Sequence, residues 1–268
     1  MSNRGEIRVG VGGWTFAPWR GAFYPDDLTQ KDELAYMSRH VTAIEINATY
    51  YGSQKPASYR KWASDTPDGF IFTLKGSRFT TNRRVLAEAG ESIAHFFRQG
   101  MSELGDKLGP ILWQFAPSKK FDDADFGAFL ELLPAKVDGL PLRHCVEVRN
   151  PSFADPAFAA LLRKHGVAVV FADHAAYPPL ADITADFVYA RLQTGSDDIA
   201  TAYPPAALDA WARRLETWAE GGRPKDLECA DANHDADESS FQHEVSPPKV
   251  AINLQPLRER VALPFLDL

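Results

Sequence analysis

Cysteine is scarce in this chain of 268 residues, which contains two cysteines, Cys145 and Cys229. Two thiols cannot form the multi-bridge framework of a small secreted protein, and Cys145 lies in an apolar run. Long apolar stretches are also missing, and the first residues mix glycine with charges of both signs, unlike a signal peptide. We therefore expect a cytoplasmic protein without a membrane partner.

A surplus of basic charge is lacking as well, because the formal net charge is −7. This balance argues against a general nucleic-acid binder held by counterion release. Between Lys225 and Val245 there are seven acidic residues and one basic residue, so most of the negative charge comes from this segment. We expect residues 225–248 to be acid-rich and flexible and the remainder to be near neutral.

Short apolar runs alternate with longer amphipathic stretches, which is typical of βα units around a parallel sheet. The length suits a barrel of about 250 residues. The predicted fold class is therefore α/β, a TIM-like (β/α)8 barrel in one domain over residues 1–268. Strands are predicted at Ile7–Gly12, Ala43–Asn47, Ile71–Lys75, Ile111–Phe115, Cys145–Arg149, Val167–Asp173 and Phe187–Arg191. Helices are predicted at Lys31–His40, Ala57–Asp65, Glu91–Lys107, Asp122–Leu133, Pro156–His165 and Pro205–Glu220.

An eighth strand is needed to close such a barrel and remove its exposed edges. Leu227–Ala230 is short and lies beside the acidic stretch, whereas Val250–Leu254 is more strand-like but follows a long polar segment. We favour Val250–Leu254 and expect an irregular or divergent closing βα unit.

Polar residues come last in successive predicted strands. Residues two apart in a strand share a face, so Glu45 shares one with Ala43, and Glu147 shares one with Cys145. A parallel barrel brings the C-terminal strand ends to one rim, where barrel enzymes keep their active sites. We expect the strand-end residues to meet there: Glu45, Asn47, Lys75, Gln114, Glu147, Arg149, Asp173 and Arg191.

These residue types define the chemistry available at the rim. Carboxylates can act as general acid and base. Lys75 can be an electrostatic partner or, if desolvated, a nucleophile that forms a Schiff base. Arginine side chains bind carboxylate or phosphate groups through two parallel hydrogen bonds. We predict catalytic roles for Glu45, Lys75, Glu147 and Asp173. The alternative is an internal ion-pair network that only fills the barrel mouth.

Six segments taken in order, GVGGWTFAPWRGAFYP, IEINATYYG, FIFTLKG, KLGPILWQFAP, CVEVRNPSF and DFVYARLQ, form a specific combination. It resembles the YecE-like family, domain of unknown function seventy-two, from about Val9 to Trp218. The resemblance implies a TIM-like barrel without an established activity. It implies these pocket positions: Trp14, Glu45, Asn47, Tyr50, Tyr51, Lys75, Gln114, Glu147, Arg149, Asp173 and Arg191.

The resemblance adds three aromatic side chains to the expected pocket, Trp14, Tyr50 and Tyr51. They would bind substrate as walls for a sugar ring or a base, together with Asn47, Gln114, Arg149 and Arg191; ordinary core packing is the alternative for the aromatics. The chain departs from the family pattern at DLECADANHDADESSFQHEVSPPK. A divergent insertion and a coding-frame change both remain open there.

Three functions are compatible with this pattern. The favoured one is an enzyme that acts on a small anionic or sugar-like molecule by carboxylate acid/base chemistry. The second is divalent-metal-dependent phosphoester cleavage, with Glu45, Glu147 and Asp173 as oxygen ligands. The third is a non-catalytic barrel that binds a ligand or nucleic acid.

Gly10, Gly12 and Gly13 do not form a nucleotide-binding motif, because Trp14 and Pro18 follow in place of a third glycine. The sequence indicates no particular cofactor, metal or oligomeric state.

Overall fold

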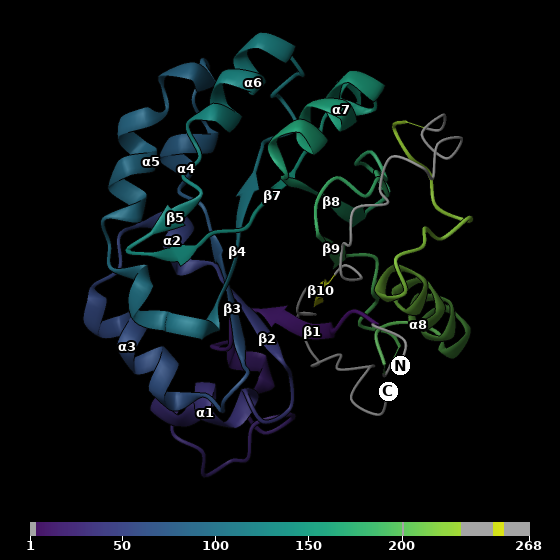
Figure 1. The fold of residues 1–268 in the computed structure, drawn as a ribbon. Helices are drawn as coiled ribbons and strands as arrows, with labels where there is room; N and C mark the ends of the chain where they lie inside the picture. The colour runs from purple at the N-terminus through teal and green to yellow at the C-terminus, as the bar shows by residue number, and fades with distance from the viewer. Residues whose placement is uncertain (1–3, 200, 232–248, 255–268) are drawn as a thin grey trace.

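A closed barrel of parallel strands forms the centre of the computed structural model (Figure 1). The structure describes residues 4–199 and 201–231, and the backbone of residues 249–254. The strands follow one another around the barrel in the order β1-β10-β9-β8-β7-β4-β3-β2. They are β1 (Ile7–Gly12), β2 (Ala43–Ile46), β3 (Ile71–Lys75), β4 (Leu108–Gln114), β7 (His144–Glu147), β8 (Ala168–Asp173), β9 (Phe187–Leu192) and β10 (Lys249–Leu254).

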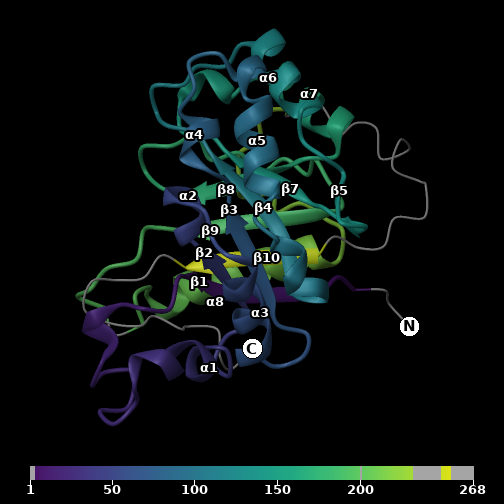
Figure 2. The same cartoon turned by 90° about the vertical axis from the view of Figure 1, so that its left-hand side faces the viewer.

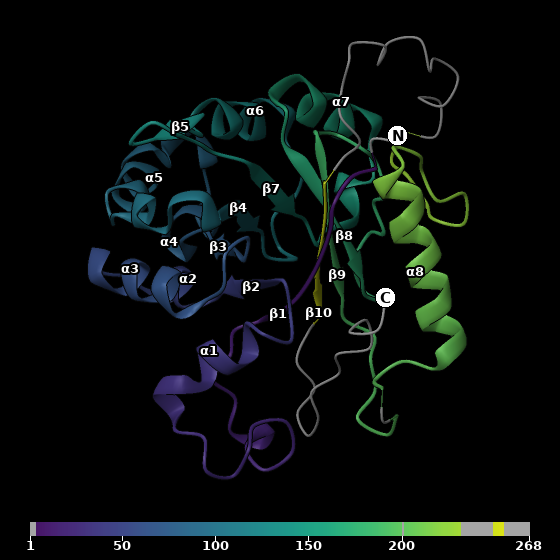
Figure 3. The ribbon, with the colours of Figure 1, turned by 60° about the horizontal axis from the view of Figure 1, so that its bottom comes forward.

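Helices cover the outside of the barrel (Figure 3), and α8 packs against β10 and β1. The α-helices are α1 (Glu33–Met37), α2 (Ala48–Tyr51), α3 (Pro56–Asp65), α4 (Arg78–Thr81), α5 (Gly90–Phe97), α6 (Asp123–Glu131), α7 (Pro156–His165) and α8 (Pro205–Ala219). The 3-10 helices are η1 (Ala17–Trp19), η2 (Gln30–Asp32), η3 (Leu86–Glu88), η4 (Met101–Lys107) and η5 (Pro151–Phe153), and β5 (Lys136–Val137) pairs with β6 (Leu140–Pro141). In the described part of the chain, no helix is long and apolar enough to cross a membrane.

Two apolar layers line the strands. The larger lies between strands and helices; there the Phe171 ring contacts the rings of Trp211 and Trp218 on α8. The smaller fills the barrel interior with the buried side chains Leu112, Cys145, Ala168, Val170, Phe187 and Tyr189. Charged residues at the C-terminal ends of the same strands therefore stand directly beyond an apolar floor.

The closing strand is β10, and it is regular. It pairs in parallel with β1 from Ile7↔Val250 to Val11↔Leu254 and with β9 on its other side, as Figure 2 shows for the yellow strand between the purple and the green ones. The prediction of a strand at Val250–Leu254 is confirmed, whereas Leu227–Ala230 is not a strand. Within the acid-rich segment 225–248, residues 232–248 lie outside the described residues, so its flexibility stays a prediction.

Several expected boundaries are wrong; the strand expected over Cys145–Arg149, for example, spans His144–Glu147. The strand expected from Ile111 begins at Leu108, so Gly109 and Pro110 lie inside β4. Proline is tolerated at a strand start or bulge, and the pairing of β4 with β3 shifts register there. The single helix expected over Glu91–Lys107 divides into α5 and η4 because Gly100 adopts a left-handed conformation, with φ at 81°.

Gly10 allows β1 and β2 to approach closely. A Cβ atom at this position would lie 2.1 Å from the carbonyl oxygen of Ala43, a backbone atom that cannot turn aside. We expect Gly10→Ala to lower the free energy of unfolding by about 1–3 kcal/mol through overpacking, measured by urea denaturation. Gly52→Ala is the matched control, because a Cβ there meets nothing within 4 Å. Equal losses in the two variants would contradict the steric explanation.

Candidate functional site

Glu147, the last residue of β7, is fully buried and receives hydrogen bonds on both carboxylate oxygens. Arg149 Nε donates to Oε1 at 2.7 Å, and Arg191 Nη1 donates to Oε2 at 2.6 Å. The amide nitrogen of Gln114 lies 2.9 Å from each oxygen. Side chains from the ends of β4, β7 and β9 therefore meet on one carboxylate.

The partners of Glu147 determine its protonation. Burial raises the pKa of this carboxyl, but the positive charges of Arg191 and Arg149 and the hydrogen bond from Gln114 outweigh burial and lower the pKa to about 2. Glu147 is therefore an anion at neutral pH.

Arg191 on β9 joins the two buried carboxylates. Its Nη1 binds Glu147, and its Nη2 lies 3.3 Å from Glu45 Oε1 on β2. The Tyr189 hydroxyl, two residues earlier on the same face, donates to Glu45 Oε2 at 3.0 Å. Burial lowers the pKa of Arg191, but the negative charges of Glu147 and Glu45 have the larger effect and raise this pKa above its usual value. The guanidinium therefore stays charged. The result is a continuous ion network across the barrel mouth.

Lys75 ends β3 and is 8% exposed. Its ammonium lies over the Tyr50 ring, 4.9 Å from the centroid. Burial lowers the pKa of Lys75 below its usual value, and the charges of Arg191 and Arg149 act in the same direction, against the carboxylates Glu45 and Glu147. Lys75 is thus a buried amine that gives up its proton more readily than an ordinary lysine.

Arg149 is the more accessible of the two guanidinium groups, with a side chain 21% exposed against 9% for Arg191. It lies over the Tyr177 ring at 4.6 Å from the centroid, and Tyr177 in turn stacks on His174 with ring centroids 3.9 Å apart. Sequence reasoning missed Tyr177, because this loop residue belongs to no strand pattern.

Asp173 makes its contacts elsewhere. Its Oδ2 accepts hydrogen bonds from Thr194 Oγ1 at 2.5 Å and from the Tyr203 hydroxyl at 3.4 Å. Asp173 shares its strand face with Phe171, which packs against α8, whereas Ala172 on the other face is the residue in register with Arg191. The expected convergence of Asp173 with the other charges does not occur, because its strand presents the opposite face to the barrel mouth.

The remaining expected pocket residues differ in placement. Tyr50 contacts Lys75, and Tyr51 beside it is 62% exposed. Trp14 is half-buried and packs edge-on against Trp62 of α3, with ring centroids 5.7 Å apart. Asn47 is half-buried at the start of α2. The ion network and Tyr50 form one centre, and binding roles for Trp14, Asn47 and Tyr51 stay predictions.

The three carboxylates expected to bind a metal, Glu45, Glu147 and Asp173, make different contacts. In the ranges that the structure describes, no three His, Cys, Asp or Glu side chains come together as metal ligands. Glu45 and Glu147 engage Arg191, and Asp173 lies apart from both. The three carboxylates named for metal-dependent cleavage therefore do not share a site.

Residues 8–243 match the family model described as "Protein of unknown function DUF72". The chain belongs to the DUF72 family. The resemblance expected from the sequence motifs is confirmed, and no activity comes with it. The ion network therefore belongs to a DUF72 protein.

Known DUF72 proteins share the fold. The structure is similar to that of a DUF72 family protein from Thermotoga maritima, with a TM-score of 0.68, 20% identity and 97% coverage of both chains. A DUF72 family protein from Enterococcus faecalis gives a TM-score of 0.65 at 15% identity, covering 94% of this chain and 91% of that one.

One curated relative also matches in sequence. The UPF0759 protein YunF of Bacillus subtilis is 25% identical over 158 residues, which are 57% of this chain and 54% of YunF. The match thus spans about half of the length of that relative. These comparisons show that the chain has the fold of DUF72 proteins.

Proposed function

We propose that this chain is an enzyme that binds a small anionic or sugar-like molecule at the C-terminal rim of the barrel, and that Lys75 transfers the proton in its reaction. The observation that carries the proposal is the buried Lys75 ammonium with its lowered pKa beside Arg149. Three cations, Lys75, Arg149 and Arg191, face two carboxylates, Glu45 and Glu147, so the centre has positive charge to offer an anion.

Glu147 suits a positioning role better than an acid/base role. Its pKa of about 2 makes it a poor proton acceptor at neutral pH, and three donors already occupy its oxygens. It holds the Arg149 guanidinium from one side, while the Tyr177 ring supports that guanidinium across its face. An arginine fixed in this way is preorganised for a carboxylate or phosphate group.

Lys75 meets the requirement for a general base. A proton acceptor works best when its pKa approaches the working pH, and burial moves Lys75 in that direction. The same amine, once neutral, could also attack a carbonyl carbon and form a Schiff base with loss of water. Both reactions need the nitrogen to lose its proton first.

Substitution of Lys75 tests the proposal. Small phosphorylated and carboxylated sugars would be screened for turnover by the wild-type protein, and we expect Lys75→Met to lower kcat by at least about 100-fold. Circular dichroism would check that the fold is retained. Lys61→Met is the matched control, since Lys61 is 61% exposed on α3 and pairs with Asp65. Turnover that survives Lys75→Met would refute the role of Lys75.

A measurement without substrate addresses the same amine. In protein labelled with ¹³C and ¹⁵N, NMR titration of the Lys75 side chain should give a midpoint below the usual 10.5. A normal midpoint for Lys75 would favour the non-catalytic reading of the barrel. A cytoplasmic location remains our prediction, and Cys145 and Cys229 are not joined by a disulfide.

A further inference from the structure

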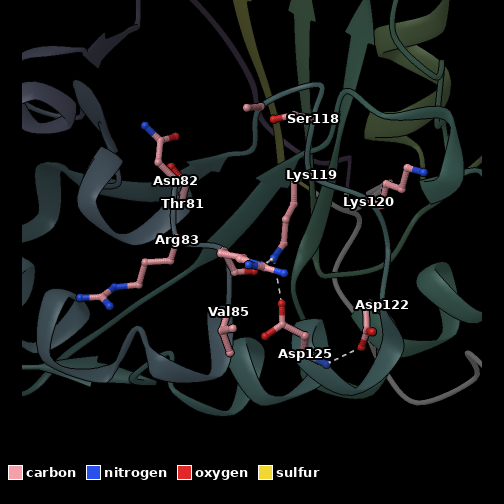
Figure 4. Close-up of a pocket in the computed structure, with 11 residues that line it drawn as sticks. Thr81, Asn82, Arg83, Val85, Ser118, Lys119, Lys120, Asp122 and Asp125 are labelled. Carbon is pink, nitrogen blue, oxygen red and sulfur yellow. Dashed lines mark hydrogen bonds and ion pairs between the residues drawn. The ribbon is translucent and has the colours of Figure 1, made fainter.

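A second cavity lies between the loops that follow β3 and β4, and its volume is about 750 Å³. One wall runs from Thr81 to Val85, and the other comes from Ala116 and from residues between Ser118 and Asp125 (Figure 4). Ala116 is two residues after Gln114, which binds Glu147, so this wall begins within roughly 7 Å of the rim centre along the chain. The cavity adjoins the centre but shares none of its charged residues.

Both acidic residues of the cavity are already engaged. Asp125 pairs with Lys119 at 2.8 Å, as the dashed line in Figure 4 shows, and accepts the backbone N–H groups of Leu86 and Ala87 at 2.6 and 3.0 Å. Asp122 accepts the backbone N–H of Asp125 at 2.9 Å and caps α6. These carboxylates organise the walls and leave little negative charge to compete for a ligand.

Three cations of the lining remain. Arg83, Arg84 and Lys120 form no ion pair with a carboxylate in the described ranges of the chain. Arg84 and Lys120 are exposed and Arg83 is half-buried. Arg83 and Lys120 belong to opposite walls, and their side chains point away from each other in Figure 4. Because no carboxylate holds these side chains, they can turn toward an anion between the walls.

Two lining residues also carry buried polar atoms whose hydrogen-bonding capacity is unused. Thr81 is 1% exposed, and its Oγ1 has no partner among the residues that the structure describes. The same holds for Arg83 Nε. Buried polar groups are normally hydrogen-bonded, and a turn of either side chain toward the cavity would let these donors bind a ligand with oxygen acceptors.

We propose that this cavity is an anion subsite that binds a phosphate group through Arg83, Arg84 and Lys120, with the Thr81 hydroxyl as an additional donor. A phosphate has enough oxygens to accept from several donors at once, and arginine matches its geometry. The volume falls in the range of pockets for small organic ligands, which favours a phosphomonoester over the free ion. The inference does not depend on proton transfer by Lys75.

Calorimetric titration at matched ionic strength tests the subsite. The probes are inorganic phosphate and ribose 5-phosphate, and the key variant is Arg83→Gln/Arg84→Gln. We expect this variant to bind both probes at least about tenfold more weakly than the wild type, since charge-assisted hydrogen bonds are lost. Tighter binding of ribose 5-phosphate would identify an esterified phosphate as the ligand, and equal binding would identify the free ion.

Two controls separate this subsite from general charge effects. Arg60→Gln/Arg98→Gln removes the same charge from exposed pairs with Glu103 and Glu91, and should leave binding unchanged. Arg149→Gln removes the anion-binding arginine of the rim centre, so the phosphate binding that this variant retains belongs to the second cavity. The proposal is overturned if wild-type protein does not bind either probe at millimolar concentration, if the two double variants lose affinity equally, or if only Arg149→Gln loses it.

Discussion

Arg191→Met should lower the free energy of unfolding by about 3–5 kcal/mol, because it removes the partner of two buried carboxylates. Glu45 and Glu147 are each fully buried at the side chain and both bind this guanidinium. Without it, two negative charges would face each other in a region of low dielectric. Chemical denaturation monitored by tryptophan fluorescence gives the measurement.

The control for this substitution is Arg214→Met. Arg214 pairs with Asp226, whose side chain is 59% exposed, and exposed pairs contribute little to stability, so its loss should be below about 1 kcal/mol. A triple variant, Glu45→Gln/Glu147→Gln/Arg191→Met, should regain part of the stability because both buried carboxylates are neutralised, although Arg149 loses its partner Glu147. If Arg191→Met is as mild as Arg214→Met, the network does not have the buried ionic character that its geometry indicates.

Acid should destabilise the protein through Glu147. The pKa of this carboxyl is about 2 in the folded chain against an ordinary value of 4.5. The unfolded chain therefore binds the proton first, so the stabilising contribution is complete above about pH 4.5 and is lost as the pH falls toward 2. A difference of this size corresponds to about 3 kcal/mol.

Urea denaturation at successive pH values measures this dependence. Glu147→Gln should flatten the slope between pH 4.5 and 2, whatever its effect on stability at neutral pH, because the titrating group is gone. Glu88→Gln is the comparison, since Glu88 is an exposed carboxylate, and it should keep the slope of the wild type. An unchanged slope in Glu147→Gln would assign the acid sensitivity to other groups.

Side-chain alternation predicts from the sequence that Glu45, Glu147 and Arg191 meet, because each strand residue of a closed barrel faces either the interior or the helices. Once Ile44 and Ile46 point to the helices, Glu45 has to face the interior, and the same logic places Glu147 and Arg191. Parallel strands then bring these residues to one end. The prediction needed only strand positions and their period of two.

The same rule failed at Asp173 for a physical reason. Strand β8 is apolar on both faces, with Val170 inside the barrel and Phe171 against α8, so its sequence does not show which face is interior. Its final charge was assigned to the rim by analogy with the other strands. The last residue before a loop is also free to bind that loop, as Asp173 does with Thr194.

The positions of loop residues also could not be predicted from the sequence pattern. Tyr177, which supports Arg149, and Arg83, which lines the second cavity, follow no periodic pattern. Their positions depend on long-range contacts such as that between Asp125 and the backbone of Leu86. A pattern confined to neighbours in sequence does not contain this information.

The pairing of β10 with β1 has a consequence for synthesis of the chain. Ile7 is in register with Val250, so the barrel cannot close until almost the whole described chain has left the ribosome. Until then β1 and β9 present unpaired edges to solvent. Contacts between such distant residues slow folding and prolong the exposure of aggregation-prone edges. The nascent protein is therefore most prone to aggregation just before β10 leaves the ribosome.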